Sequence, residues 1–437
     1  MKKFLNLIIV ILLCLNSCAT QTKKEDVSDN NETQSAIVDV EDGGTMNMSY
    51  VPQTPNSVKA VWLSQWDMQR VFLKGSSQRS ETDFRVRATE IMHNARQDGF
   101  NTVFLQVRPF GDSFYPSDFY PPSKMVVGEY GNEFIYDPIK ILIESAHEEG
   151  LSIHAWINPF RLMTTEEIEC VDDRYSIRRW YDSQQLRGRY LVLQADGRWY
   201  LNPGYSEVRN LIIDGAEEIF ENYPVDGLHL DDYFYPTTST SYDAECFANY
   251  VTAGGEMSLA DFRRDCISQL VHELWGMVHE ISPKALFGIA PGGNPDRAYS
   301  VQYADVFRWG RELGFVDYLC PEIYFGFEHE SYPFDKTANR WSEIVSCSYV
   351  KLIIGLSFHK AASGFDQYAG SGAYEWANND DVLYRSLLFV SSMERCSGVA
   401  VFSYQHFRNA LTGEIPDYPK SERDNFLPLF KQTVFGV

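Results

Sequence analysis

The sequence lacks several patterns that assign a chain of this length to a common functional class. Its eight cysteines include no C-x-x-C spacing, which argues against a zinc centre or a small disulfide scaffold. No G-x-G-x-x-G or Walker loop follows the first apolar segment, so nothing indicates a nucleotide-binding sheet. Basic residues are scarce. The chain has 38 Lys and Arg and 60 Asp and Glu, so its formal net charge is −22. We therefore predict no metal or cofactor and no nucleic-acid partner.

The amino terminus has the layout of an exported lipoprotein. Lys2 and Lys3 precede an apolar run from Phe4 to Leu15, which is too short to span a bilayer and is typical of a secretory signal. The run ends in Leu-Asn-Ser-Cys, which resembles a bacterial lipobox with Cys18 as the lipidated residue. We predict a signal peptide at residues 1–17 and a mature protein held at the bacterial cell envelope, on the outer membrane or cell surface, only by a lipid anchor.

Residues 18–56 and 57–437 differ in composition. The first segment is rich in charged and small polar residues and has little to bury, so it is predicted to be a disordered tether. The second has no long polar linker, low-complexity stretch or internal repeat, which favours one large domain. Whether any of its cysteines form a disulfide stays open.

Short, apolar, β-branched segments recur along this domain, at residues 58–64, 102–108, 151–158, 227–233, 285–291, 316–325, 350–358 and 398–404. Helical patterns that stop near a Gly or Pro separate most of them, at residues 82–98, 138–149, 206–222, 259–281, 303–313 and 381–395. This alternation implies parallel strands joined by right-handed crossovers. We predict the α/β class and a single (β/α)8 TIM barrel, with a doubly wound sheet as the structural alternative.

Two adjacent carboxylates, Asp231 and Asp232, stand where the fourth predicted strand ends among aromatic residues. The segment reads Asp-Gly-Leu-His-Leu-Asp-Asp-Tyr-Phe-Tyr-Pro over residues 226–236. Hydrolysis of a glycosidic bond needs a proton donor for the leaving oxygen and a negative group beside the developing oxocarbenium ion. Capping of the next turn is the structural alternative. Because barrel chemistry lies at the carboxyl ends of the strands, the segment predicts a sugar-cleaving site.

The alternation of side chains along a strand predicts which other residues face the barrel axis. Polar and aromatic groups gather near the strand ends, which indicates a ligand cleft. Predicted substrate-binding residues are Trp62, Gln106, Arg108, His154, Asn158, Arg161, His229, Tyr233 and Tyr324. Trp66, Tyr205 and Tyr235 are further candidates for sugar stacking. Glu322 is a third carboxylate, with an ion pair to Arg108 or Arg161 as its alternative role, and buried structural roles are the alternative for both histidines.

Several ordered runs resemble the bacterial glycosyl hydrolase-like family ten: VKAVWLSQWD, NTVFLQVRPFGDSFYPS, HAWINPFR, LNPGYSEVR, VDGLHLDDYFYP, FGIAPGG and VDYLCPEIYF. The resemblance implies a TIM-barrel catalytic domain and a cell-wall substrate, namely peptidoglycan glycan strands already stripped of their peptides. The segment from Asp226 to Tyr233 also resembles the D-x-x-D-x-D-x-E signature of chitinase-like barrels. It departs from that signature at His229 and at Tyr233, which stands where the signature has its proton donor.

This departure leaves the general acid open between Asp232 and Glu322. An adjacent acid pair resembles that of hexosaminidase-type barrels, which makes Asp231 the stabilising carboxylate. The predicted function is retaining or substrate-assisted hydrolysis of a β-linked N-acetylated glycan. A non-catalytic glycan-binding surface lipoprotein and a hydrolase of dietary or host polysaccharide are the two alternatives, since fold does not fix substrate.

Overall fold

The computed structural model describes residues 50–231 and 235–436. The predicted signal peptide, the lipidation site Cys18 and most of the predicted tether lie outside the described residues. The same holds for Asp232 and Tyr233, which fall between the two described parts. Within the described ranges, no helix is long and apolar enough to cross a membrane.

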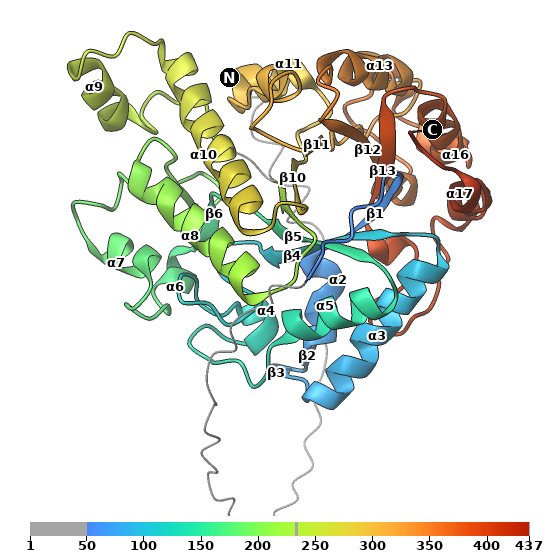
Figure 1. The fold of residues 1–437 in the computed structure, drawn as a ribbon, viewed down its shortest axis with the longest axis horizontal. Coiled ribbons are helices and arrows are strands. Elements are labelled where there is room, and N and C mark those ends of the chain that lie inside the picture. The colour runs from blue at the N-terminus through green and yellow to red at the C-terminus, as the bar shows by residue number, and fades with distance from the viewer. Residues whose placement is uncertain (1–49, 232–234, 437) are drawn as a thin grey trace, which may run out of the picture. The chain divides into compact units, whose positions relative to one another are not determined.

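Eight parallel strands form a closed barrel in the order β1-β13-β12-β11-β10-β9-β5-β4 (Figure 1). They are β1 (Val58–Leu63), β4 (Thr102–Arg108), β5 (Ser152–Ile157), β9 (Gly227–Leu230), β10 (Leu286–Ile289), β11 (Tyr318–Leu319), β12 (Lys351–Ser357) and β13 (Cys396–Phe402). The barrel closes because β1 pairs with β13 on one side and with β4 on the other. The predicted (β/α)8 barrel is confirmed.

Helices surround the barrel (Figure 1), and their apolar residues are buried in the core. The longer ones are α3 (Glu81–Gln97), α5 (Pro138–Glu148), α8 (Ser206–Asn222), α10 (Leu259–Ile281), α13 (Phe334–Ile344), α16 (Val382–Ser391) and α17 (Lys420–Gln432). Helix α5 shows why such segments begin where they do. The Asp137 carboxylate accepts hydrogen bonds from the backbone N–H groups of Ile139 and Lys140, both at 3.0 Å, and Pro138 fills the first helical position.

Shorter elements lie in the connections of the barrel. They are α2 (Gln65–Phe72), β2 (Leu73–Lys74), β3 (Ser77–Gln78), α4 (Lys124–Val127), α9 (Ala244–Thr252), α11 (Pro295–Val301), α12 (Val306–Trp309), α14 (Phe358–Ser363) and α15 (Glu375–Asn378). The helix predicted over residues 303–313 is too long, because only Val306–Trp309 (α12) is helical within it. Tyr303 has a left-handed backbone with φ 58°, and its buried hydroxyl accepts a 3.0 Å hydrogen bond from Arg263. The helix therefore begins three residues after Tyr303.

Polar side chains cap the amino-terminal end of the barrel. Asp226, at the start of β9, accepts hydrogen bonds from the backbone N–H of Ile153 at 2.7 Å and from the Tyr50 hydroxyl at 2.6 Å. Asp317, just before β11, accepts from the backbone N–H of Phe287 at 2.7 Å. Asp226 therefore has a structural role, accepting hydrogen bonds where the strands begin. This end of the barrel is opposite to the end that carries Asp231.

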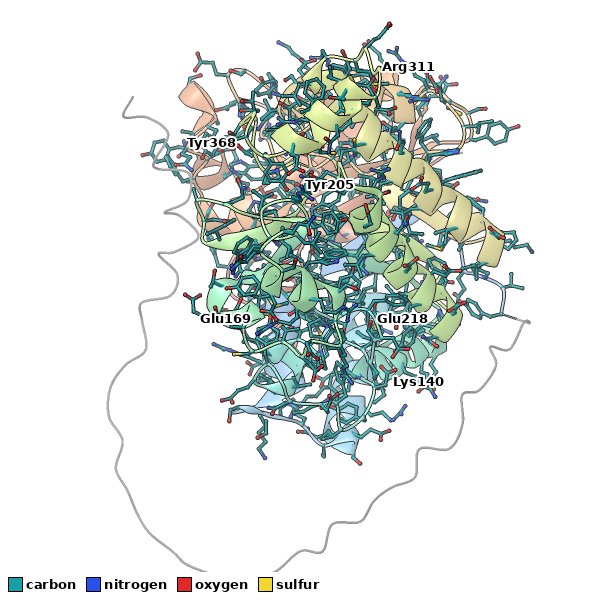
Figure 2. All side chains as sticks on the ribbon, turned by 90° about the vertical axis from the view of Figure 1, so that its left-hand side faces the viewer. Lys140, Glu169, Tyr205, Glu218, Arg311 and Tyr368 are labelled. Atoms are coloured by element: carbon teal, nitrogen blue, oxygen red, sulfur yellow. The ribbon has the colours of Figure 1, made fainter. Side chains whose placement is uncertain are left out.

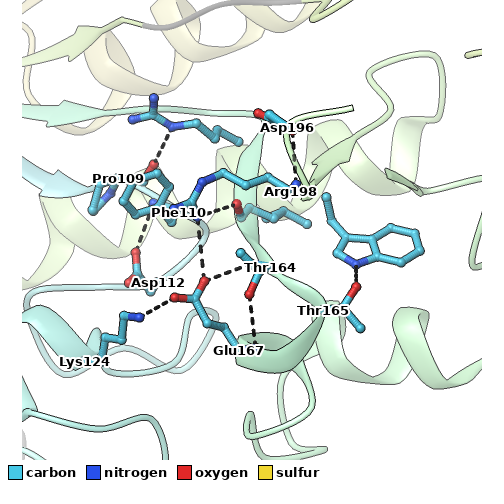
Figure 3. A network of polar contacts seen from close by, with 12 residues as sticks. Pro109, Phe110, Asp112, Lys124, Thr164, Thr165, Glu167, Asp196 and Arg198 are labelled. Carbon is cyan, nitrogen blue, oxygen red and sulfur yellow. Dashed lines mark hydrogen bonds and ion pairs between the residues drawn. The ribbon is translucent and has the colours of Figure 1, made fainter. Parts of the chain in front are cut away.

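A three-stranded antiparallel sheet, β6-β8-β7, follows β5 at the carboxyl-terminal end of the barrel. Its elements are β6 (Arg161–Thr164), α6 (Thr165–Ile168), α7 (Ser176–Asp182), β7 (Leu191–Leu193) and β8 (Arg198–Leu201). The Arg198 guanidinium lies 4.0 Å from the centre of the Phe110 ring and 3.7 Å from Glu167, which also pairs with Lys124 (Figure 3). This network fixes the sheet to the loop after β4.

Candidate active site

A directed chain of hydrogen bonds crosses the barrel interior below the mouth. The Trp62 indole N–H only donates, so Nε2 of His229, 3.1 Å away, must accept. His229 therefore carries its proton on Nδ1 and donates it to the Tyr318 hydroxyl at 2.9 Å. The Tyr318 hydroxyl in turn donates to Nδ1 of His154, also at 2.9 Å. The chain links four strands through their inward-facing side chains.

Burial keeps both histidines of this chain neutral. Desolvation lowers the pKa of His154 to about 4, and it lowers the pKa of His229 well below its usual range. The His229 ring also stacks on Phe104 with ring centres 4.1 Å apart. Since His154 is 3% exposed and His229 and Tyr318 are fully buried, these side chains form the floor of the site.

The floor gives a stability prediction for Tyr318→Phe. Removing the hydroxyl leaves the buried Nδ1 atoms of His154 and His229 without this partner, which should lower the free energy of unfolding by about 1–3 kcal/mol. Chemical denaturation measures this loss in the free energy of unfolding. Tyr349→Phe is the matched control, because Tyr349 is 74% exposed. Equal stability of the two variants would contradict the inferred chain.

A second polar chain holds the backbone at Asp231. The Gln106 amide accepts from the backbone N–H of Gln65 at 2.8 Å and donates to the Asn158 side chain at 2.7 Å. Asn158 donates to the carbonyl of Asp231 at 3.2 Å. Three inward-facing residues predicted from the alternation, Gln106, Asn158 and Asp231, thus meet at the mouth, where Asp231 is half-buried.

Glu322 continues the barrel beyond β11. Its backbone pairs with Gly292 on one side and with Gly355 of β12 on the other, and its side chain is half-buried. A Cβ at Gly355 would lie 3.1 Å from the Glu322 Cα and 2.9 Å from the Pro321 carbonyl oxygen, so the strands approach this closely only because residue 355 is glycine. The backbone is therefore shaped to place Glu322 at the rim.

The Cys320 thiol lies in the barrel interior, and its pKa is affected by the carboxylates of Asp231 and Glu322. Burial raises its pKa well above the usual range, and Glu322 and Asp231 raise it further, because a thiolate would be repelled by both. Asp231 follows β9 and Glu322 follows β11, and only β10 lies between these strands. The two carboxylates therefore converge on one region of the mouth.

An aromatic wall completes the mouth between β11 and β13. The Tyr324 ring lies 5.0 Å from His359 and 6.0 Å from Phe402, and Phe402 lies 6.1 Å from Trp62. Burial lowers the pKa of His359 to about 3, so this imidazole is neutral. His359 and Phe402 were not predicted as site residues, although each lies at the end of a predicted strand.

The predicted orientation of Arg108 is wrong. The pairing of β4 with β5 shifts register between Gln106 and Arg108, and this irregularity turns the arginine to the outside of the barrel. Its guanidinium carbon lies 4.2 Å from the centre of the Tyr120 ring, and a Cβ at Gly215 of α8 would meet its Nη1 at 2.6 Å. Arg108 is buried between β4 and α8, away from the mouth.

The remaining predicted residues lie in different surroundings. Arg161, at the start of β6, is half-buried, with its guanidinium 4.5 Å from the Phe110 ring centre. Trp66 is 58% exposed on α2, as a stacking ring requires. Tyr235 is buried, with its ring 5.4 Å from that of Tyr303, so it packs inside the protein and its predicted stacking role is wrong. All described cysteines are free thiols.

A closed parallel barrel with carboxylates and aromatic rings at the carboxyl ends of its strands defines a TIM-barrel enzyme of the glycoside hydrolase type. The sequence pattern of the family described as Glycosyl hydrolase-like 10 matches residues 57–369. The chain therefore belongs to this family, and it is an enzyme of the glycosidase class.

Named relatives and solved structures agree with this assignment. The chain is 28% identical to Glycosyl hydrolase DigH of Escherichia coli K12, over 84% of this chain and 88% of the relative. It is 30% identical to Glycosyl hydrolase YngK of Bacillus subtilis, over 72% of this chain and 63% of the relative. The fold is similar to the PgaB glycoside hydrolase domain of Bordetella bronchiseptica (TM-score 0.52, 12% identity, 84% and 98% covered). It is also similar to the catalytic domain of a Paenibacillus polymyxa beta-amylase (TM-score 0.54, 11% identity, 86% and 99% covered).

Proposed function

We propose that the chain hydrolyses a β-linked N-acetylated glycan of the bacterial cell wall, with peptide-stripped peptidoglycan as the substrate. The observation that carries the proposal is the placement of Asp231 and Glu322 just after β9 and β11, the two strands that flank β10 in the barrel. An aromatic wall beside two carboxylates suits a sugar ring, which has apolar faces and polar edges. The choice of glycan rests on the resemblance of the ordered motifs to their family.

In the proposed reaction, the sugar at the cleaved bond lies above the Trp62 floor and against Tyr324. A carboxylic acid, Asp232 or Glu322, donates its proton to the glycosidic oxygen as the bond to the anomeric carbon breaks, so the leaving chain departs as an alcohol. The Asp231 carboxylate stabilises the positive charge at the anomeric centre, directly or through the substrate's acetamido group. Water then adds to the anomeric carbon and returns a proton to the acid.

The predicted sugar-binding residues divide into two groups in this proposal. Arg161, Tyr233 and Tyr324 contact the sugar, whereas Trp62, Gln106, His154, Asn158 and His229 hold the site from below. The second group is already engaged in the two hydrogen-bond chains. Arg108 does not contact the sugar in this proposal, because its side chain faces α8.

A substrate panel tests the proposal. Purified protein is incubated with peptide-stripped peptidoglycan, intact peptidoglycan, chitin oligosaccharides and neutral polysaccharides, and new reducing ends are measured. We expect the peptide-stripped glycan to be cleaved fastest. Faster release from a neutral polysaccharide would favour a dietary or host substrate. Binding to the stripped glycan without any product would favour the non-catalytic alternative.

We also propose that Cys18 anchors the protein to the cell envelope. The lipobox-like run before Cys18 and the polar segment after it support this location. Cys18→Ser should prevent lipidation, so the variant is expected to leave the detergent phase in Triton X-114 partitioning, whereas the parent stays in it. Cys170→Ser, which changes an exposed thiol of the barrel domain, is the control. Equal partitioning of the Cys18 variant and the parent would contradict the anchor.

A further inference from the structure

We propose that an exposed aromatic cluster on the β12–β13 connection binds a glycan strand outside the cleavage site, an inference that rests on the proposed function. The cluster, here the aromatic platform, consists of Phe365, Tyr368 and Tyr374, which are 45%, 56% and 62% exposed. The Phe365 and Tyr374 rings lie with their centres 5.2 Å apart. Large rings gathered on a surface mark interaction sites more often than rings scattered singly.

The platform stands on a rigid loop. Asp366, which is buried, forms a 2.9 Å ion pair with Lys360, and its carboxylate accepts a hydrogen bond from the backbone N–H of Tyr368 at 3.1 Å. Across the loop, the backbone N–H of Asp366 donates to the carbonyl of Ala373 at 2.9 Å. Because these contacts hold the backbone of the loop, little of its conformational entropy is lost when the rings bind a ligand.

A neighbouring loop reinforces this scaffold. The buried Glu375 carboxylate accepts from the backbone N–H groups of Phe327 and Glu328, at 3.1 and 2.8 Å. The backbone N–H of Glu330 donates to the Ala369 carbonyl at 3.0 Å. The loops that follow β11 and β12 are thus fastened to each other, and both belong to the carboxyl-terminal face of the barrel.

The platform connects to the mouth through α14. This helix begins directly after β12, and His359 in its first turn contacts Tyr324 of the aromatic wall. Its six residues rise about 9 Å, since an α-helix rises 1.5 Å per residue. Phe365 follows the helix, and Tyr368 lies at the margin of the molecule (Figure 2). One short helix therefore joins the platform to the aromatic wall of the mouth.

The surroundings of the platform supply hydrogen-bond acceptors for a glycan. Glu328 and Glu330 are exposed beside the loop, and the Glu330 carboxylate accepts a 3.2 Å hydrogen bond from the backbone N–H of Ser371. Carboxylates next to rings accept hydrogen bonds from sugar hydroxyls while the rings stack on the sugar's apolar face.

Co-sedimentation with insoluble peptide-stripped peptidoglycan tests the platform. The assay uses Asp231→Asn as the background, so that the glycan stays intact, and adds Phe365→Ala, Tyr368→Ala and Tyr374→Ala together. We expect binding about 10-fold weaker than that of the background, because each stacked ring contributes to affinity. Tyr349→Ala is the matched control, since this 74% exposed tyrosine lies before β12, at the opposite end of the barrel.

Three results would overturn the proposal: no binding by the background, equal binding with and without the rings, or ring-dependent binding to vesicles of phosphatidylethanolamine and phosphatidylglycerol instead. Binding is measured without turnover, so a failure of the hydrolase proposal is seen separately, as absence of product from the parent. If the parent cleaves, the three substitutions should slow cleavage of long strands more than that of short oligosaccharides. An equal loss on both would also overturn it.

Discussion

Asp231→Asn is expected to slow glycan cleavage by about 10³-fold, within the range of a lost catalytic carboxylate. The substitution removes the negative charge from the anomeric centre and keeps the size of the side chain. It also keeps the backbone hydrogen bonds of residue 231 with Ile157 and Asn158, at 3.3 and 3.2 Å, so the fold should be unchanged. The measurement is kcat for release of reducing ends from peptide-stripped peptidoglycan.

Asp424→Asn is the matched control, because Asp424 is half exposed on α17, outside the barrel. This variant should keep the parent rate. If Asp231→Asn stays within ten-fold of the parent while folded normally, Asp231 is not the stabilising carboxylate.

The same assay identifies the acid. Asp232→Asn and Glu322→Gln are compared on the natural glycan and on a 4-nitrophenyl glycoside of an N-acetylglucosamine oligomer. The variant that lacks the acid should lose activity on the glycan and much less on the nitrophenyl substrate, because that leaving group departs without protonation. If neither variant shows this difference, neither residue donates the proton.

Asp243→Asn is expected to lower the free energy of unfolding by about 3–5 kcal/mol, because it leaves a buried guanidinium without its counter-charge. Arg263 and Asp243 are both fully buried in their side chains. Arg263 donates to Asp243 from Nε at 2.8 Å and from Nη2 at 2.5 Å, and Nη2 also donates to the Ser239 carbonyl at 2.7 Å. This pair holds residues Ser239 and Asp243, which follow Asp231 and Asp232 in the chain, so a folded variant should also lose activity. Chemical denaturation measures the loss of stability.

The Arg340–Asp296 pair supplies the control. Its contact is also 2.5 Å, but the two side chains are 45% and 56% exposed. Asp296→Asn should cost no more than about 1 kcal/mol, because water screens a surface ion pair. Equal destabilisation by Asp243→Asn and Asp296→Asn would show that burial of the first pair does not matter.

The barrel could be predicted because local and global signals agree. Each strand is a short β-branched run, and most connecting helices have a polar face and a stop signal, so alternation alone implied parallel pairing. The same alternation correctly turned Gln106 and Asn158 inward, where their side chains form a hydrogen bond and Asn158 also holds the Asp231 carbonyl. Period-two counting succeeds wherever a strand keeps its register.

The failures have identifiable physical causes. The register shift in β4 turns the Arg108 side chain to the face opposite to the predicted one. No residue type in that strand predicts this irregularity. The helix predicted to begin at Tyr303 begins at Val306, because the left-handed backbone of Tyr303 does not fit an α-helix. The sheet β6-β8-β7 was not predicted, since its strands are three or four residues long and partly polar. His359 reaches the wall through the start of α14, after the regular strand geometry has ended.

Mass spectrometry of the soluble products shows whether the protein cleaves the glycan and whether cleavage needs Asp231. Peptide-stripped peptidoglycan is incubated with the parent protein and, in parallel, with Asp231→Asn. We expect glycan fragments with new reducing ends from the parent and a yield lower by about 10³-fold from the variant. Equal fragmentation by both proteins would contradict the assignment of Asp231, and no fragments from the parent would contradict the proposed activity itself.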